Sequence, residues 1–372
     1  MKKRAFVLIL SLLLNSCMLN AHHAISYKLN GGRLGDCIYS FCLAKWLAYK
    51  YETKFYYVPF EHADAFSLGL YEEQLTQTIE KTFKKTVLIR TEEALAYQLK
   101  KTKKKTLFYI DFLATIDAPQ DIKEADPLME NIVATNWLFL FMKQHQAFDA
   151  EIKRDLEFRQ RPQDITLPDG MISVAVHVRK GGGFDRPLTS CQYAHDQKSE
   201  CIRGCQLSTD AIDRILPLKF PPEQYYVDQI IKVSDMLNNQ PIFACIFTDD
   251  PEPERLIERF KQRINRPNIL FASAHNGHNV FQHNVLDDVY QMSRFDCLIK
   301  TDSHFAWIAQ LIGAHKICVY PQWSEWDAVN SMNIITKVGV LFNKGPLKDI
   351  VYMPFIILTQ EHKKVAAHCC SA

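Results

Sequence analysis

The chain has 372 residues, which is more than one typical domain core needs and enough for two domains. Apolar residues make up 47% of the chain and charged residues 23%, which is the balance of an ordinary globular protein. The formal net charge is only +2, so the chain lacks the broad basic character of a nucleic-acid-binding protein. Composition therefore favours a two-domain globular protein and excludes nucleic acid as an expected partner.

The N-terminus departs from this globular composition. A basic tripeptide precedes an apolar run over residues 5–14, which is the pattern of a secretory signal and is short for a bilayer span. We expect residues 1–24 to be a signal peptide, cleaved after Ala21 or Ala24, or an uncleaved N-terminal anchor. Residues 14–17 (LNSC) weakly resemble a bacterial lipobox. We therefore expect a protein of the secretory pathway or an exported one (periplasmic, secreted or anchored), with this end as the point of any membrane association.

Eleven cysteines are many for a cytosolic enzyme, and export would permit disulfides. Cys191, Cys201 and Cys205 lie in one polar loop, which favours a local crosslink; a zinc site completed by His195 is the alternative. Three further cysteines lie in apolar, strand-like runs and are expected to be buried free thiols: Cys245, Cys297 and Cys318.

The N-terminal half alternates strand-like and helix-like segments, as an α/β domain does. Residues 24–29 are expected to form a strand and residues 37–51 a helix, with a glycine loop over residues 30–36 between them. The loop's glycines are Gly31, Gly32 and Gly35. Such a loop offers backbone N–H groups and a positive helix end to a phosphate or sugar, although many strand-to-helix turns need glycine for geometry alone. Further strands are expected at 54–58, 86–89 and 107–112, and a helix at 137–153.

A polar, proline-bearing stretch over residues 162–169 is the best candidate for a linker. It separates an N-terminal α/β domain (25–165) from a C-terminal domain (166–350), which a tail (351–372) follows.

The C-terminal half repeats strand–helix units more clearly. Strands are expected at 172–178, 242–247, 269–272, 295–300 and 317–320, and helices at 223–237, 251–262, 285–293 and from 302 to 312. Gly313 is expected to end the helix over residues 302–312, and Pro251 is expected at the first position of the helix over residues 251–262. Repeats of this kind predict a parallel, doubly wound sheet, in which ligands bind beyond the carboxyl ends of the strands.

The strand ends of this half carry the residues best suited to an anionic ligand. His177, Arg179 and Lys180 close an apolar strand ahead of three glycines. A guanidinium grips phosphate oxygens with two prongs, and it can neutralise the charge of a departing diphosphate. Lys180 is expected to add a point charge. The alternatives are a strand end with a solvated loop and, for Arg179, a surface salt bridge.

Two further strand ends carry hydroxyl and carboxyl groups. Asp250 precedes Pro251 and is better explained as a helix cap, so Asp249 is the stronger candidate of the two to bond a ribose hydroxyl or a base edge. Asp302 and Ser303 begin the last helix, either as a plain cap or as a phosphate site built with helix N–H groups. An aspartate pair can hold Mg²⁺, but no metal is needed where an arginine, a lysine and a helix end are present.

Two loops contribute weaker candidates. His275, His278 and His283 share one polar loop, where acceptor contact or a metal site competes with a plain loop. Asp185 follows Arg179 by six residues and is a candidate general base, with a solvated loop carboxylate as the alternative.

Three segments, in order, resemble the superfamily that includes α1,6-, α1,2-, protein O- and nodulation fucosyltransferases. The glycine loop and its helix resemble the family's N-terminal loop, and residues 177–180 (HVRK) resemble its His-x-Arg segment. Residues 248–260 and 292–312 resemble its two later donor-site motifs.

The resemblance implies two Rossmann-like doubly wound domains (the GT-B fold), with the donor site in the C-terminal one. It implies an inverting, metal-independent transfer of fucose from GDP-fucose to a glycan or protein hydroxyl. His177 and Asp249 would contact guanine or ribose, Arg179 and Ser303 would hold the β-phosphate, and the glycine loop would line the donor cleft.

The chain departs from that pattern in one place. The α1,6 enzymes carry a carboxylate shortly after the motif arginine, where this chain has Pro187, with Asp185 only nearby. Two alternatives therefore stay open: a glycosyltransferase that uses another nucleotide sugar, and a catalytically inactive glycan-binding or interaction protein.

Overall fold

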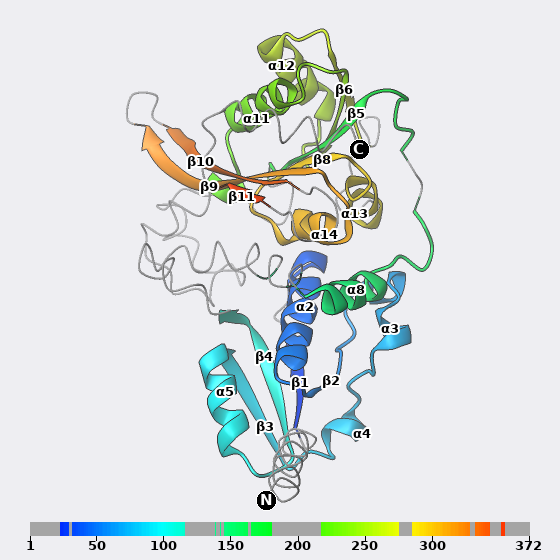
Figure 1. Cartoon of the computed structure of the whole chain (residues 1–372), viewed down its shortest axis with the longest axis vertical. Helices are drawn as coiled ribbons and strands as arrows, with labels where there is room; N and C mark the ends of the chain where they lie inside the picture. Colours follow the sequence, from blue (N-terminus) through cyan, green and yellow to red (C-terminus); the bar gives the residue numbers. More distant parts are fainter. Residues whose placement is uncertain are drawn as a thin grey trace, which may run out of the picture. The chain divides into compact units, whose positions relative to one another are not determined.

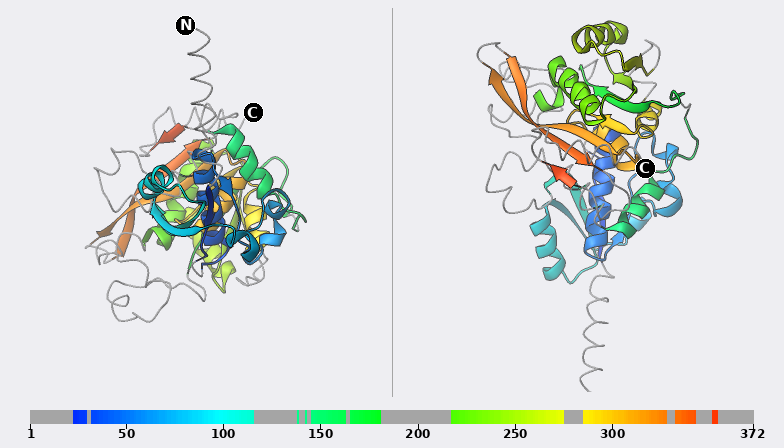
Figure 2. Two further views of the ribbon diagram at one scale, coloured as in Figure 1. Left: turned by 90° about the horizontal axis from the view of Figure 1, so that it is seen from below. Right: turned by 45° about the horizontal axis from the view of Figure 1, so that its top comes forward.

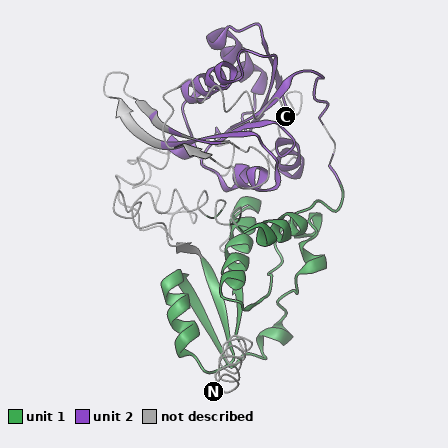
Figure 3. Cartoon of the chain, viewed as in Figure 1, with its two compact units in different colours: residues 1–160 green, residues 161–372 purple. Residues whose placement is uncertain are grey.

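The structure is a computed structural model of the chain (Figure 1). It describes residues 23–29, 32–115, 138, 142, 145–162, 165–180, 217–274, 285–327, 332–342 and 351–353. The chain divides into two compact units, residues 1–160 and 161–372, coloured separately in Figure 3.

Unit 1 is built on a four-stranded parallel sheet in the order β2-β1-β4-β3. Its strands are β1 (His23–Tyr27), β2 (Lys54–Phe55), β3 (Lys85–Thr91) and β4 (Thr106–Thr115). Its helices are α2 (Leu34–Lys50), η1 (Ala63–Ala65), α3 (Leu68–Tyr71), α4 (Gln77–Glu80), α5 (Glu92–Lys101) and α8 (Gln146–Asp155). The strand–helix alternation expected from the sequence is confirmed, and β1 is buried along its whole length.

Helix α2 occupies the centre of unit 1 and packs against β1, β2 and β4. Residues on all its sides are buried, so the helix is largely enclosed and carries little of the one-sided pattern of a surface helix. The helix begins three residues earlier than expected, so Gly35 belongs to its first turn instead of to the glycine loop.

Unit 2 contains a seven-stranded sheet in the order β11-β10-β9-β8-β5-β6-β7. Its strands are β5 (Ile172–Val178), β6 (Ile242–Thr248), β7 (Ile269–Ser273), β8 (Cys297–Ile299), β9 (Ile317–Asp327), β10 (Met332–Phe342) and β11 (Val351–Met353). Its helices are α11 (Glu223–Met236), α12 (Pro253–Ile264), α13 (Val285–Met292) and α14 (His304–Ile312). The five strands from β9 to β7 run parallel, which confirms the expected parallel sheet.

The strand order creates a switch point between β5 and β8. From β5 the chain proceeds outward through β6 and β7, then returns to the other side of β5 through β8 and β9. The connections that leave β5 and β8 therefore diverge, and this divergence opens the crevice in which doubly wound sheets bind ligands. In the views of Figures 1 and 2, α11 and α12 lie on one face of the sheet and α13 and α14 on the other.

The core of unit 2 shows how β5 divides its side chains between these faces. Val174, Val176 and Val178 join a large apolar cluster with residues of α11 and α12. Because successive side chains of a strand alternate between faces, His177 lies on the opposite side, where its ring is 5.7 Å from that of Phe305. The valines anchor the strand, and the histidine is held at its carboxyl end.

Two features of unit 2 differ from the expectation. Helix α12 begins at Pro253, so this proline and not Pro251 takes the first helical position. The sheet also continues into the antiparallel strands β10 and β11, which were not predicted. Pairing of β10 with β9 extends β9 well beyond the four residues expected for it. Alternation gives only a local signal, whereas this pairing is a long-range contact.

Two other expectations concern cysteines and the membrane. Cys245, Cys297 and Cys318 are buried free thiols, as predicted. In the described ranges, no helix has the length and apolar character to cross a membrane.

Candidate functional site

The guanidinium of Arg179 and the hydroxyl of Ser303 meet at the switch point of unit 2. Arg179 follows the last residue of β5, and Ser303 precedes the first residue of α14. Nη1 of Arg179 lies 3.4 Å from Oγ of Ser303, a long hydrogen bond between residues 124 positions apart. The structure therefore brings together the arginine and the helix start that the sequence proposed as parts of one anion site.

Ser303 does not use its hydroxyl to cap α14. It occupies the N-cap position with an extended backbone, yet its side chain makes no capping hydrogen bond. Its Oγ faces Arg179 instead, so the first N–H groups of the helix are left without this partner. Of the two interpretations of Ser303, the plain cap is the one that the geometry does not support.

A carboxylate ties the end of β6 to the end of β5. Oδ1 of Asp249 accepts a hydrogen bond of 2.6 Å from the backbone N–H of Lys180. This bond leaves less of Asp249 for a ligand than the sequence suggested, because one oxygen fixes the turn after β5. Asp250 accepts from the backbone N–H of Glu252 at 2.9 Å, just ahead of α12. The helix-cap interpretation of Asp250 is therefore wrong, because Glu252 occupies the N-cap position of α12 and Asp250 stabilises the turn before it.

The ammonium of Lys180 is engaged by Glu223 at the start of α11. The two groups are 2.7 Å apart, and Arg259 of α12 grips the same carboxylate through two bonds of 2.8 and 3.0 Å. Burial alone would raise the pKa of Glu223, but the bonds from Arg259 and Lys180 outweigh it and hold the pKa at about 2. The charge that Lys180 was expected to offer to an anion is thus shared with a protein carboxylate.

His177 is a buried, neutral imidazole. Its Nδ1 lies 3.4 Å from Oγ1 of Thr301. Burial, together with the nearby charges of Arg179 and Lys300, lowers the pKa of His177 to about 3. At physiological pH it can therefore bond a polar ligand group without adding charge.

Asp302 sits between the strand end of β8 and α14. Its backbone N–H donates to the carbonyl of Leu218 at 3.0 Å, which joins this turn to the segment before α11. Burial raises the pKa of its carboxyl, while the charges of Lys300 and Arg179 oppose that rise. The residue stands beside Ser303, as the sequence placed it.

The glycine loop belongs to unit 1, and only part of it is described. A Cβ on Gly32 would come within 2.4 Å of the side chain of Asp36, so close packing alone requires a glycine there. The structure gives no contact that assigns Gly32 or Gly35 to a ligand. Gly31 lies outside the described residues.

Several other predicted candidates also lie outside the described residues. They are Asp185, Cys191, His195, Cys201, Cys205, His275, His278 and His283. Within the part of the chain that is described, no group of three or more potential ligand side chains could hold a metal ion.

Sequence reasoning missed two residues that belong to this region. Phe220 stacks under Arg179, with the guanidinium carbon 5.3 Å from the ring centroid. Lys300 follows β8 directly and is only 1% exposed. Nothing in the sequence marks Phe220, but a lysine at the end of the strand expected over residues 295–300 was a visible signal.

Comparisons with known proteins add little at the level of sequence. No family model matches the chain, and no curated protein matches it. Among solved structures it is similar to POFUT1 in complex with GDP-fucose, at 12% identity and a TM-score of 0.35, covering 80% of this chain and 94% of that one.

Two other solved structures are similar to the chain at the same level. The apo-form of POFUT1 matches at 11% identity and a TM-score of 0.36, with coverage of 80% and 95%. An Arabidopsis thaliana FUT1 variant in complex with GDP matches at 12% identity and a TM-score of 0.44, with coverage of 87% and 82%. Likeness of this degree does not establish a family or an activity for the chain.

Proposed function

We propose that the chain is a fucosyltransferase that transfers fucose from GDP-fucose to a hydroxyl of a glycan or protein, with inversion and without a metal. The observation that carries the proposal is the meeting of Arg179 with Ser303 at the switch point between β5 and β8. The His-x-Arg and Asp-Ser segments that resemble fucosyltransferase motifs are the two segments that this contact joins. We further propose that the two units adopt the GT-B arrangement, with the donor in unit 2.

The site's residues fit the chemistry of a leaving diphosphate. The acceptor oxygen attacks the anomeric carbon from the face opposite GDP, and the bond from that carbon to the β-phosphate oxygen breaks. The electron pair leaves with GDP, where Arg179 and the hydroxyl of Ser303 offset the growing charge. The acceptor's proton passes to a carboxylate, for which Asp185 is the candidate. Neutral His177 and Asp249, at the carboxyl ends of β5 and β6, are the candidates to bond the nucleoside.

The first test is nucleotide selectivity. Thermal unfolding is measured with GDP, UDP and ADP at equal concentration, and GDP should raise the midpoint most because a ligand stabilises the state that binds it. A larger shift with UDP or ADP would point to a transferase that uses another nucleotide sugar. Selective GDP binding and glycan binding without any transfer would instead favour the inactive glycan-binding alternative.

The second test is Arg179→Ala. Loss of one group that stabilises developing charge should lower kcat by at least about 100-fold. Arg179→Lys should retain part of the activity, because it keeps the charge but not the two-pronged geometry. Arg255→Ala is the matched control, since Arg255 is on α12 with a side chain that is 74% exposed. Full turnover by Arg179→Ala would refute the assigned role.

We also propose that the chain is exported and that the cut follows Ala21. Strand β1 begins at His23, and Ala24 pairs with both Lys54 and Leu107. A cut after Ala24 would remove the first two residues of a strand with neighbours on both sides, whereas a cut after Ala21 leaves it whole. N-terminal sequencing of the secreted protein tests this, and a mature chain that begins at Ile25 would contradict it.

A further inference from the structure

Lys300 is a buried lysine whose ammonium has no hydrogen-bonding or ion-pairing partner in the described residues. It is 1% exposed, and its Nζ lies 5.4 Å from the ring centroid of Tyr320. In the described part of the chain, its ammonium makes no hydrogen bond and no ion pair. Its backbone, by contrast, is held firmly, because the N–H donates to Val319 and the carbonyl accepts from Tyr225.

The neighbours of Lys300 do not neutralise it. His177 faces it from β5, Cys318 and Tyr320 face it from β9, and Asp302 and His304 follow in the turn and first residue of α14. His177 is neutral. The charge of Asp302 acts on the ammonium, but the two groups form no ion pair in the described part of the chain. Burial lowers the pKa of Lys300, which shows that this position disfavours the charge. A well-packed apolar residue would be the more stable choice here.

The position of Lys300 suggests a role for a charge that destabilises the ligand-free fold. It is the residue that follows β8, on the same face of the sheet as His177 and three positions before Ser303. The charges of Lys300 and Arg179 both act on His177 and on Asp302. Two cations thus converge on the switch point from the two strands that flank it, and the helix start of α14 lies beside them.

We propose that Lys300 is the second cationic determinant of this anion site and makes it select a diphosphate over a monophosphate. An added phosphate brings added negative charge, and a cation in a poorly solvated position responds to that charge more strongly than a solvated one does. The inference rests on the proposed function only in taking the anion to be the diphosphate of a nucleotide. It does not depend on which base or sugar the nucleotide carries.

The test compares Lys300→Met and Lys300→Gln with the unaltered full-length chain. Titration calorimetry gives the Kd of GDP and of GMP for each protein. Removal of the charge should weaken GDP about tenfold or more, as expected for a lost charged interaction, and should weaken GMP only about two- to threefold. The GDP-to-GMP preference should therefore fall in both variants, although one keeps a polar head and the other does not.

Lys316→Met is the matched control. Lys316 precedes β9, at the opposite end of the same strands, where its side chain is 33% exposed and lies 3.6 Å from Asp296. The substitution is the same, but the charge removed is remote from the carboxyl ends of the strands. It should leave the GDP-to-GMP preference unchanged.

A second measurement is independent of any ligand. Lys300→Met should raise the unfolding midpoint of the ligand-free protein, because it removes a buried charge that forms no ion pair with a described residue. A lower midpoint or failure to fold in both variants would show that the ammonium is structural. An unchanged GDP-to-GMP preference would show that the ammonium does not distinguish a diphosphate from a monophosphate. Either result overturns the proposal.

The outcomes also separate this inference from the proposed function. If the unaltered protein binds UDP or ADP in place of GDP, the donor assignment is wrong, and the preference of that diphosphate over its monophosphate tests Lys300 in the same way. If no nucleoside diphosphate binds the unaltered protein, both the proposed function and the role of Lys300 are wrong.

Discussion

The two units each bury a lysine, and the surroundings of the two lysines are opposite. In unit 1, Lys45 of α2 has a side chain that is 5% exposed and contacts three carboxylates. In unit 2, Lys300 is 1% exposed and has no ion pair with any described residue. The pKa of Lys45 is raised, because its ion pairs outweigh burial, whereas burial lowers the pKa of Lys300.

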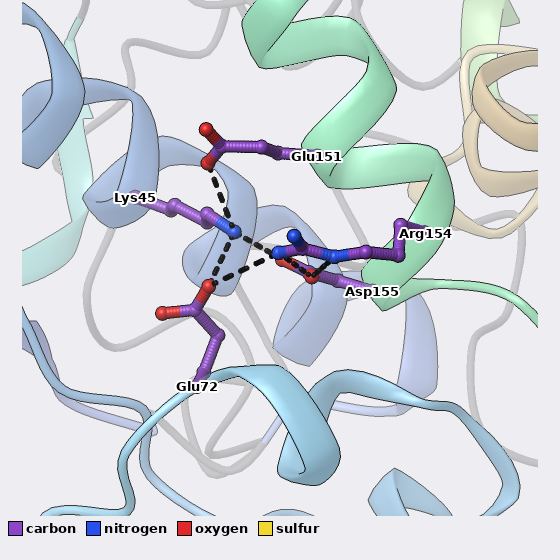
Figure 4. A network of polar contacts seen from close by, with 5 residues as sticks. All are labelled: Lys45, Glu72, Glu151, Arg154 and Asp155. Carbon is purple, nitrogen blue, oxygen red and sulfur yellow. Dashed lines mark hydrogen bonds and ion pairs between the residues drawn. The ribbon is translucent and has the colours of Figure 1, made fainter.

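Figure 4 shows how completely Lys45 is matched. Its ammonium bonds the fully buried Asp155 and lies 2.6 Å from Glu72 and 3.6 Å from Glu151. Arg154 closes the network with bonds of 2.9 and 3.2 Å to the other oxygen of Asp155. The network joins α2, α8 and the segment after α3, so it holds elements of unit 1 together.

The contrast teaches how to separate a structural buried charge from one kept for a ligand. A buried charge with a structural role forms ion pairs within the fold. Removing one partner is strongly destabilising, because the remaining charge stays buried without full compensation. An unmatched charge costs stability in the free protein and regains it only when an anion binds. The two lysines are therefore expected to respond in opposite directions when they are altered.

The largest expected effect is on Lys45. Asp155→Asn should destabilise the protein by about 3–5 kcal/mol, because it keeps the shape but leaves a buried ammonium with weaker partners. Urea denaturation measures the change. Glu151→Gln is the control, since Glu151 is 42% exposed and its loss should cost less than about 1 kcal/mol. Equal losses of unfolding free energy in the two variants would show that the buried ion pair of Lys45 with Asp155 stabilises the fold no more than its exposed contact with Glu151.

The next effect is on Lys300 and carries a pH signature. Lys300→Met should be more stable than the unaltered protein by about 1–4 kcal/mol near neutral pH. The pKa of Lys300 is lower in the folded protein than in the unfolded chain. The destabilisation caused by burying its charge is therefore fully present at pH values below the folded pKa. It disappears as pH rises from the folded pKa toward the unfolded value of about 10.4.

Denaturation of both proteins across that range measures the gap between them. The gap should narrow steadily as the solution becomes more alkaline. A gap that is independent of pH would mean that packing, and not charge, separates the two proteins. Lys316→Met supplies the baseline, because it removes a partly exposed lysine that already has an acidic neighbour.

The sequence predicted the strands and helices of this region better than the partners of its charged side chains. The apolar run ending at Val178 predicted β5 without error, and Gly313 correctly marked the end of α14. These features are local, since alternation and helix stops are written in neighbouring residues. The repeated strand–helix units predicted a parallel sheet, but the strand order that places the switch point between β5 and β8 was known only from the structure.

Charge pairing was not predictable in the same way. Lys180 lies two residues past β5 and Lys300 directly follows β8, yet one ammonium bonds Glu223, 43 positions away, and the other forms no ion pair in the described residues. The same limit applies to Ser303, whose hydroxyl could not be assigned to cap or ligand until its 3.4 Å contact with Arg179 was known. Such contacts depend on tertiary distances that no spacing in the sequence specifies.

Glu223 is an intermediate case between the two lysines, because its side chain is 21% exposed and three cations surround it. Glu223→Gln should cost about 1–2 kcal/mol at neutral pH, the range of a charge-assisted bond that is partly solvated. The folded pKa of about 2 lies below the unfolded value of about 4.3, so its contribution is complete above the unfolded value and is lost as pH falls toward 2.

Acid denaturation of the unaltered and Glu223→Gln proteins checks this expectation. Their stabilities should converge as pH falls from about 4 toward 2. Lys261→Met is the control, because Lys261 forms an exposed pair with Glu258 on the outer surface of α12 and should change stability by less than about 0.5 kcal/mol. Curves that stay parallel in acid would show that the carboxylate of Glu223 is not the group that titrates.

The smallest expected effect is an absence of titration at His177. It tests whether the carboxyl ends of β5 and β8, beside Arg179 and Lys300, are shielded from water. The NMR signals of its ring should stay constant from pH 8 to about 5, because its folded pKa is about 3. Since the unfolded imidazole binds a proton near pH 6.5, the folded state should lose stability as pH falls from about 6.5 toward 3. His177→Asn identifies the signal by removing it. Titration near pH 6.5 would mean that water reaches the carboxyl ends of β5 and β8 freely. In that case an ammonium on the same face would be solvated, and the opposition between Lys45 and Lys300 would lose its physical basis.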